Sequence, residues 1–197
     1  PGDNQREIDH GVIIVATGAN EYQPKEFLYG EDDRVLTQIG LADRLADKGA
    51  DDLSTVVMIQ CVGSRNDEME ECSRICCQNA VKNALNLLDI NPDALIFILY
   101  RDMRTYAFQE EYYQKARERG VIFVRYQQDS PPEVNPAGDC VEVSYRDIIL
   151  GRDVKVSADC LCLSTGLIAY EDSNEELAMI FKLPRTEDGY FLEDHVK

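Results

Sequence analysis

Apolar runs and amphipathic stretches alternate through the middle of the chain. The runs at 55–61, 94–100 and 121–126 are predominantly apolar, which is typical of strands buried on both faces of a sheet. The stretches between them, 73–89 and 108–119, repeat apolar residues at helical spacing. Strand, helix, strand, helix and strand joined by short links predict an α/β fold with a parallel sheet and right-handed crossovers.

The pattern changes after the Ser-Pro-Pro segment at 130–132. Two short stretches of alternating polarity, 140–145 and 154–157, flank the turn residues 151–153. They predict a small antiparallel hairpin or meander, because alternation with a period of two is typical of half-buried strands. A last continuous apolar strand is expected at 160–165.

Two apolar strands, at 10–19 and 160–165, lead into similar Thr-Gly pairs. We interpret each as a crossing between two domains, so that the segment between them forms an inserted domain of roughly 100 residues or a little more. The flanks then belong to another domain. A helix is expected at 35–46. Two unrelated buried strands are the alternative interpretation of the same pattern.

Composition limits the partners of the chain. Thirty-seven acidic residues against 20 basic ones give a formal net charge of −17, which disfavours binding to nucleic acid and to anionic membrane surfaces. No stretch approaches the roughly 18 apolar residues of a membrane span. The seven cysteines are odd in number and clustered, which indicates a reducing compartment such as the cytoplasm and not a disulfide framework.

Four of the cysteines form a C-x10-C-x3-C-C set directly after the strand at 55–61. Cys61 ends that strand, and the other three surround the first turn of the next predicted helix. Parallel sheets of this kind bind ligands at the carboxyl ends of their strands, and a helix N-terminus stabilises negative charge there. Four thiolates at this place favour an iron–sulfur cluster, with the ligand set Cys61, Cys72, Cys76 and Cys77.

Other uses of these thiols stay open. Four thiolates also suit structural zinc, the neighbours Cys76 and Cys77 suit a redox-active dithiol, and buried thiols can be inert. A dinucleotide site is disfavoured, because Gly63 stands alone where the phosphate-binding turn needs three glycines. Arg101 and Arg104, which follow the next strand, either meet a phosphate or bridge acidic neighbours.

The remaining cysteines and the histidines carry less information. Cys160 and Cys162 lie two apart on one strand, so they share a face and are expected to be core residues. Cys140 is expected to be a packing residue as well. His10 and His195 lie near opposite ends of the chain, so no catalytic set can be assembled around them.

The segment around the cysteines resembles a known family. IQCVGSR, CSRICCQNAVKNAL and ILYRDMRTYAFQEEYYQKARERGVIFVRY resemble the A subunit of heterodisulfide reductase and related subunits of the quinone-interacting membrane-bound oxidoreductase complex. The closing LCLSTGLIA and TEDGYFLEDHVK are similar to the same family's return into its flavin domain. The resemblance covers nearly the whole chain and is most specific at CVGSR and CSRICC.

The resemblance implies a flavoprotein with a fold like that of thioredoxin reductase. A Rossmann-like inserted domain is expected at 55–158, a flavin-domain remnant with its linker at 1–54, and a return into a truncated flavin domain at 159–197. In this family, four cysteines hold a [4Fe–4S] cluster. Their positions match Cys61, Cys72, Cys76 and Cys77.

The function implied by the resemblance is electron transfer between FAD and the [4Fe–4S] cluster. The chain would be an oxidoreductase subunit that works with other subunits in the cytoplasm, without insertion into a membrane. The family's strand-end Thr-Gly pairs, which lie near the flavin domain, match Thr17-Gly18 and Thr165-Gly166.

The family's FAD-gripping G-x-G-x-x-G is missing from this sequence. We therefore expect an interior fragment that binds no FAD by itself and is inactive alone. Two alternatives are an NAD(P)H-binding domain of a pyridine-nucleotide-disulfide-type reductase and a scaffold with structural zinc.

Overall fold

The structure is a computed structural model that describes residues 7–47 and 49–192. The chain divides into two compact units, one formed by Glu21–Leu167 and the other by the segments that flank it. Strands β1 (Ala19–Glu21) and β10 (Leu167–Ala169) pair with each other where the chain passes between the units. The cysteine block lies in the unit Glu21–Leu167.

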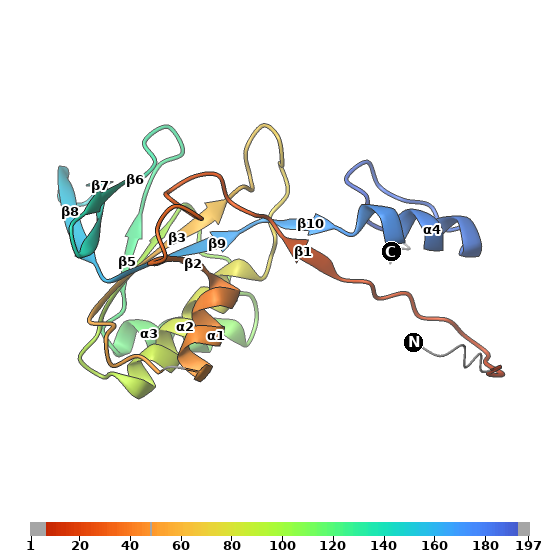
Figure 1. Ribbon diagram of the computed structural model, residues 1–197, viewed down its shortest axis with the longest axis horizontal. Helices are drawn as coiled ribbons and strands as arrows, with labels where there is room; N and C mark the ends of the chain where they lie inside the picture. Colours follow the sequence, from red (N-terminus) through yellow and green to blue (C-terminus); the bar gives the residue numbers. More distant parts are fainter. Residues whose placement is uncertain (1–6, 48, 193–197) are drawn as a thin grey trace. The chain divides into compact units, whose positions relative to one another are not determined.

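A five-stranded parallel sheet forms the centre of this unit (Figure 1). The strand order is β2-β9-β3-β4-β5, and each neighbouring pair is parallel. Helices α1, α2 and α3 cover one face of the sheet. The bounds are β2 Val35–Thr37, α1 Gln38–Asp47, β3 Thr55–Val62, α2 Cys76–Ile90, β4 Leu95–Tyr100, α3 Gln109–Glu118, β5 Ile122–Arg125 and β9 Cys160–Thr165.

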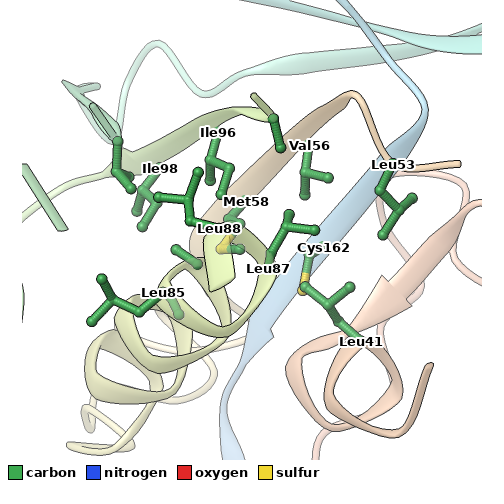
Figure 2. Packing of buried hydrophobic residues seen from close by; sticks show 14 of the residues in the cluster. Leu41, Leu53, Val56, Met58, Leu85, Leu87, Leu88, Ile96, Ile98 and Cys162 are labelled. Atoms are coloured by element: carbon green, nitrogen blue, oxygen red, sulfur yellow. The ribbon is translucent and has the colours of Figure 1, made fainter. Parts of the chain in front are cut away.

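The larger hydrophobic core lies between the sheet and the helices (Figure 2). Leu87 of α2, Met58 of β3 and Cys162 of β9 are fully buried there. Burial of one such aliphatic side chain contributes about 1.5–3 kcal/mol. The strands are mostly apolar because their other face is buried too, and this explains why the sequence pattern identified them.

A three-stranded antiparallel sheet covers the opposite face. Val141 and Val143 of its middle strand pack in one cluster with Ile59 and Leu163 of the parallel sheet. The predicted hairpin is confirmed, and a third strand with little buried surface and a proline, Pro136, joins it. The bounds are β6 Glu133–Ala137, β7 Cys140–Asp147 and β8 Arg152–Ala158.

Two of the predicted elements are wrong in part. The helix expected at 35–46 begins only at Gln38, because the three residues before it form β2 and pair with the distant β9. Of the strand expected at 10–19, only Ala19 is in a strand, and Val12 and Ile14 are 77% and 86% exposed. A strand needs a neighbouring strand for its backbone hydrogen bonds. Among the described residues the neighbour is β10, which pairs with the chain only from Ala19 onwards.

Strands β2 and β9 lie outside the range 55–158 that the sequence analysis assigned to the inserted domain. Both are part of the compact unit Glu21–Leu167. The domain boundaries after residues 54 and 158 stay a prediction.

The flanking unit contains helix α4 (Glu171–Phe181). Buried Asn174 donates a hydrogen bond to the Gly189 carbonyl oxygen at 3.1 Å and so ties this helix to the segment that follows it. Within the described part of the chain, no helix has the length and apolar character needed to cross a membrane.

Candidate metal centre

Cys61 lies at an irregularity near the end of β3. Ile59 pairs with Leu163 and Val62 pairs with Thr165, so β3 contains one residue more than β9 over this interval. Cys61 has a φ of 64°, which is the left-handed region that glycine usually occupies in such a bulge. A non-glycine residue held there costs of order 1–3 kcal/mol, and such residues concentrate at functional sites.

The loop after Cys61 is packed tightly from both sides by backbone and by an aromatic ring. A Cβ added at Gly63 would come within 2.1 Å of the Tyr22 ring, and one added at Gly166 would lie 2.6 Å from the Gly63 carbonyl oxygen. The Gly166 N–H donates to the Val62 carbonyl oxygen at 2.8 Å. These two glycines therefore serve close packing of the chain on itself.

The other three cysteines lie at the start of α2. Cys76 and Cys77 are its first two residues and are buried, whereas Cys72 is half-buried in the preceding loop. The helix has no side-chain N-cap, and the Arg74 N–H donates to the Cys72 sulfur at 3.4 Å. The free amide groups and the positive end of the helix dipole therefore favour negative charge at this position.

The pKa values of Cys72, Cys76 and Cys77 are coupled to one another, and the charge of Cys61 acts on that of Cys77. Hydrogen bonding with Cys76 and burial raise the pKa of Cys72. Hydrogen bonding with Cys72 lowers the pKa of Cys76, but hydrogen bonding with Cys77 and burial outweigh it and raise that pKa to about 11. The pKa of Cys77 is lowered, chiefly by hydrogen bonding with Cys76, although the nearby Cys61 opposes this. Thiols coupled in this way lose their protons together only when a cation offsets the charge.

A charged pair that sequence reasoning missed lies beside these thiols. Arg65 points one nitrogen, Nη1, at the Cys61 sulfur at 3.8 Å and donates from the other, Nη2, to Asp102 at 2.7 Å. This hydrogen bond is the main cause that lowers the pKa of the Asp102 carboxyl. The Cys77 thiol donates to the Asp102 backbone oxygen at 3.9 Å. The local sequence gives no sign of this contact, because Arg65 follows β3 and Asp102 follows β4.

Arg101 has a structural role in the same place. Its two terminal nitrogens donate to the backbone oxygens of Ser64 and Arg65, each at 2.9 Å, and the side chain is buried. The sequence analysis considered that arginines after β4 bridge acidic neighbours. In the structure the acidic neighbour Asp102 is paired with Arg65, and Nη2 of Arg125 lies 3.4 Å from it.

The chemistry of the donors fits an iron–sulfur cluster. Thiolates are the usual ligands of such clusters, and all four thiols are free. Within residues 7–47 and 49–192, no three His, Cys, Asp or Glu side chains are arranged to hold a single metal ion.

The residues predicted to contact a flavin are distributed over both units. Thr17 and Gly18 belong to the flanking unit, whereas Thr165 and Gly166 belong to Glu21–Leu167. Thr165 is buried at the end of β9, and Gly18 has a φ of 72°. A role of these residues in cofactor binding stays a prediction.

Curated proteins resemble this chain along nearly its whole length. The iron–sulfur A subunit of the CoB–CoM heterodisulfide reductase of Methanocaldococcus jannaschii is 35% identical over 205 residues, or 95% of this chain. An A subunit of the same enzyme from Methanopyrus kandleri is 34% identical over 210 residues, or 95% of the chain. This chain is homologous to part of the A subunit of heterodisulfide reductase. It spans 31% of the length of either relative, and no protein-family model matches it.

Solved structures support the fold of this heterodisulfide reductase homologue. Thioredoxin reductase from T. acidophilum superposes with a TM-score of 0.57 at 15% identity, and the match covers 90% of this chain and 50% of that one. Thioredoxin reductase from Lactococcus lactis gives 0.57 at 21% identity with the same coverage. The predicted α/β fold of the thioredoxin reductase type is therefore confirmed.

Proposed function

We propose that the unit Glu21–Leu167 is an electron-transfer module whose four cysteines hold a [4Fe–4S] cluster. The observation that carries this proposal is the position of the free thiols, with Cys61 in a left-handed bulge near the carboxyl end of β3 and Cys76 and Cys77 in the first turn of α2. When bound, the cluster would supply a one-electron carrier. The names of the relatives, which describe an iron–sulfur subunit, support the same assignment.

Residues of this chain would bind the cluster and balance its charge. Cys61 would bind from the strand end, while Cys72, Cys76 and Cys77 would bind from the loop and the first turn of α2. The helix N-terminus and nearby Arg65 offset the negative charge of the thiolates. Burial of Cys76 and Cys77 limits the access of water and oxidants to that side of the site.

The arrangement of the glycines disfavours a nucleotide in the same position. A phosphate-binding turn uses glycines so that a ligand can approach the backbone closely. Here the space next to Gly63 is filled by Tyr22, and the space next to Gly166 is filled by backbone. Of the two arginines considered for a phosphate, Arg101 is already engaged by backbone oxygens.

We further propose that the module works within an oxidoreductase complex. By analogy with its relatives, it would exchange electrons with an FAD bound in the longer protein near Thr17-Gly18 and Thr165-Gly166, and it would assemble with other subunits. The seven cysteines include no disulfide, which fits a reducing compartment such as the cytoplasm.

Anaerobic reconstitution of the chain with iron and sulfide tests the proposal. We expect about four iron and four sulfide per chain, as in other [4Fe–4S] proteins, and a low-temperature EPR signal after reduction with dithionite. Cys76→Ala should abolish uptake, whereas Cys162→Ala, a core thiol on β9, should retain it. Uptake of zinc without sulfide, or unchanged iron content in Cys76→Ala, would contradict the proposal, and tight NADPH binding by calorimetry would favour a nucleotide site.

A further inference from the structure

We propose that Arg65 and Asp102 form a charged pair that sets the reduction potential of the metal centre, with Arg65 raising it and Asp102 lowering it. The inference rests on the proposed function, because it assumes that the neighbouring thiols hold a cluster. Neither residue is a ligand in that proposal, so both act as positioning and electrostatic groups.

Arg65 is placed by the backbone of the loop that carries Cys61. Cys61, Gly63 and Arg65 all have positive φ values, of 64°, 61° and 57°. This conformation turns the chain so that the guanidinium returns to within 3.8 Å of the Cys61 sulfur. Its side chain is only 20% exposed, so its charge is partly shielded from solvent.

Asp102 connects this guanidinium with the second group of thiols. Its carboxylate accepts from Arg65 at 2.7 Å and lies 3.4 Å from Arg125, while its backbone oxygen accepts from the Cys77 thiol at 3.9 Å. The pair therefore lies between the cysteine of the strand and a cysteine of the helix. Its two charges have opposite signs, and the guanidinium contacts both the Cys61 sulfur and the Asp102 carboxylate.

The backbone around the pair is clamped, so the charges cannot easily move away. Arg101 donates to the backbone oxygens of Ser64 and Arg65, and Arg125 donates through Nε to the backbone oxygen of Arg101 at 2.9 Å. These bonds join the loop after β3 to the ends of β4 and β5. A fixed charge in a partly buried position acts on its surroundings more strongly than a solvated one.

The direction of the effect follows from the charge balance of reduction. One electron, supplied in the experiment by dithionite, makes the centre more negative by one unit. The cation of Arg65 stabilises the reduced form more than the oxidised form, and the anion of Asp102 does the reverse. Hydrogen bonds to the sulfurs and local charge are known levers on cluster potentials.

Redox titration of the reconstituted full chain, followed by EPR, tests the inference. We expect Arg65→Gln to lower the equilibrium constant of reduction about tenfold, or about 59 mV for one electron. Asp102→Asn, which keeps an oxygen to accept from Arg65, should change the potential in the opposite direction. Arg65→Lys, which keeps the charge, should restore most of the potential.

Arg119→Gln is the matched control. Arg119 is paired with Asp89 and is 27% exposed, similar to Arg65, but this pair lies at the other end of α2, about 20 Å from Cys76 along the helix axis. It should leave the potential unchanged.

The outcomes separate the two proposals. Equal potentials in all loaded variants, or shifts of Arg65→Gln and Asp102→Asn in one direction, would overturn the role of the pair and leave the cluster assignment intact. Loss of iron from both charge-altering variants but not from Arg65→Lys would make the pair a structural brace and would also overturn its role. Absence of iron and sulfide in the unmodified chain would contradict the proposed function, and the inference with it.

Discussion

Cysteines on two neighbouring strands of one sheet, β9 and β3, lie in very different surroundings. Cys160 and Cys162 pair with Val56 and Met58 in the middle of β3 and are fully buried among apolar residues. Burial raises the pKa of Cys160 to about 12. Cys61 instead lies near the end of β3, on a left-handed backbone and within reach of a guanidinium. Position along the strand therefore distinguishes a packing thiol from a candidate ligand.

Thiol reactivity is the largest difference that this comparison predicts. In the metal-free chain at pH 8, we expect iodoacetamide to modify Cys61 at least about 100-fold faster than Cys160 and Cys162, because alkylation needs an accessible thiolate and the latter two thiols are closed to solvent. Half-buried Cys72, whose pKa is raised, should react more slowly than Cys61. A time course with peptide mapping by mass spectrometry measures the rates. In denaturant the four rates should become similar, and similar rates in the native chain would contradict the distinction.

The sequence predicted the strands that are buried on both faces. Runs such as 55–61 and 160–165 are apolar because helices cover one face and an antiparallel sheet covers the other. The short strand β2 escaped prediction because it is only three residues long and its partner, β9, lies far along the chain. The strand predicted at 10–19 was mostly wrong. Its apolar pattern indicated burial, but the pattern says nothing of whether a partner strand lies beside it.

The sequence predicted those features of the candidate site that depend on residue type and on the position of strand ends. Cysteine spacing and the carboxyl-edge rule predict that the four thiols lie together, and the structure places Cys61 near the end of β3 and Cys76 and Cys77 at the start of α2. That the four bind one centre stays a prediction. The left-handed conformation of Cys61 was not predictable, because left-handed backbone is usually signalled by glycine and this position carries a cysteine. The contact of Arg65 with Asp102 depends on how β3 and β4 align, which no single segment of sequence encodes.

A second prediction concerns stability. Cys162→Ser should lower the free energy of unfolding by about 2 kcal/mol, because it places a hydroxyl in an apolar core that is fully closed to solvent. The same substitution at half-buried Cys72 should change the free energy of unfolding of the metal-free chain by less than about 0.5 kcal/mol. Urea denaturation followed by circular dichroism measures both. Equal losses would show that the two groups of thiols do not differ in their structural role.

A third prediction tests the strain at Cys61. Cys61→Gly should stabilise the metal-free chain by about 1 kcal/mol, because glycine adopts a φ of 64° without steric cost. Cys61→Ala removes the thiol but keeps the Cβ, so it should give no such gain and serves as the control. Thermal and urea unfolding of the three chains measures the difference. If alanine and glycine stabilise equally, the loss of sulfur is responsible and the backbone at this position is unstrained.

The smallest effect is expected at an ion pair away from the four cysteines. Asp32 accepts three hydrogen bonds from Arg34, one from its backbone N–H at 3.0 Å and two from its guanidinium at 2.8 and 2.6 Å. These bonds, the side-chain ones first, lower the pKa of Asp32 from 3.8 to about 2. A carboxyl whose pKa is lower in the folded chain stabilises it above its ordinary pKa, and this stabilisation is lost as the pH falls.

The pH dependence of Asp32→Asn therefore distinguishes this pair from the one beside the cysteines. At pH 6 the variant should be less stable than the parent chain by less than about 1 kcal/mol, because the pair lies near the surface. The difference should disappear as the pH falls from about 4 to 2, where the carboxyl of the parent chain becomes protonated. Urea midpoints at several pH values measure it. After reconstitution Asp32→Asn should leave the reduction potential unchanged, whereas Asp102→Asn should raise it. A pH-independent difference, or a shift in potential with Asp32→Asn, would show that this carboxylate acts through more than its pair with Arg34.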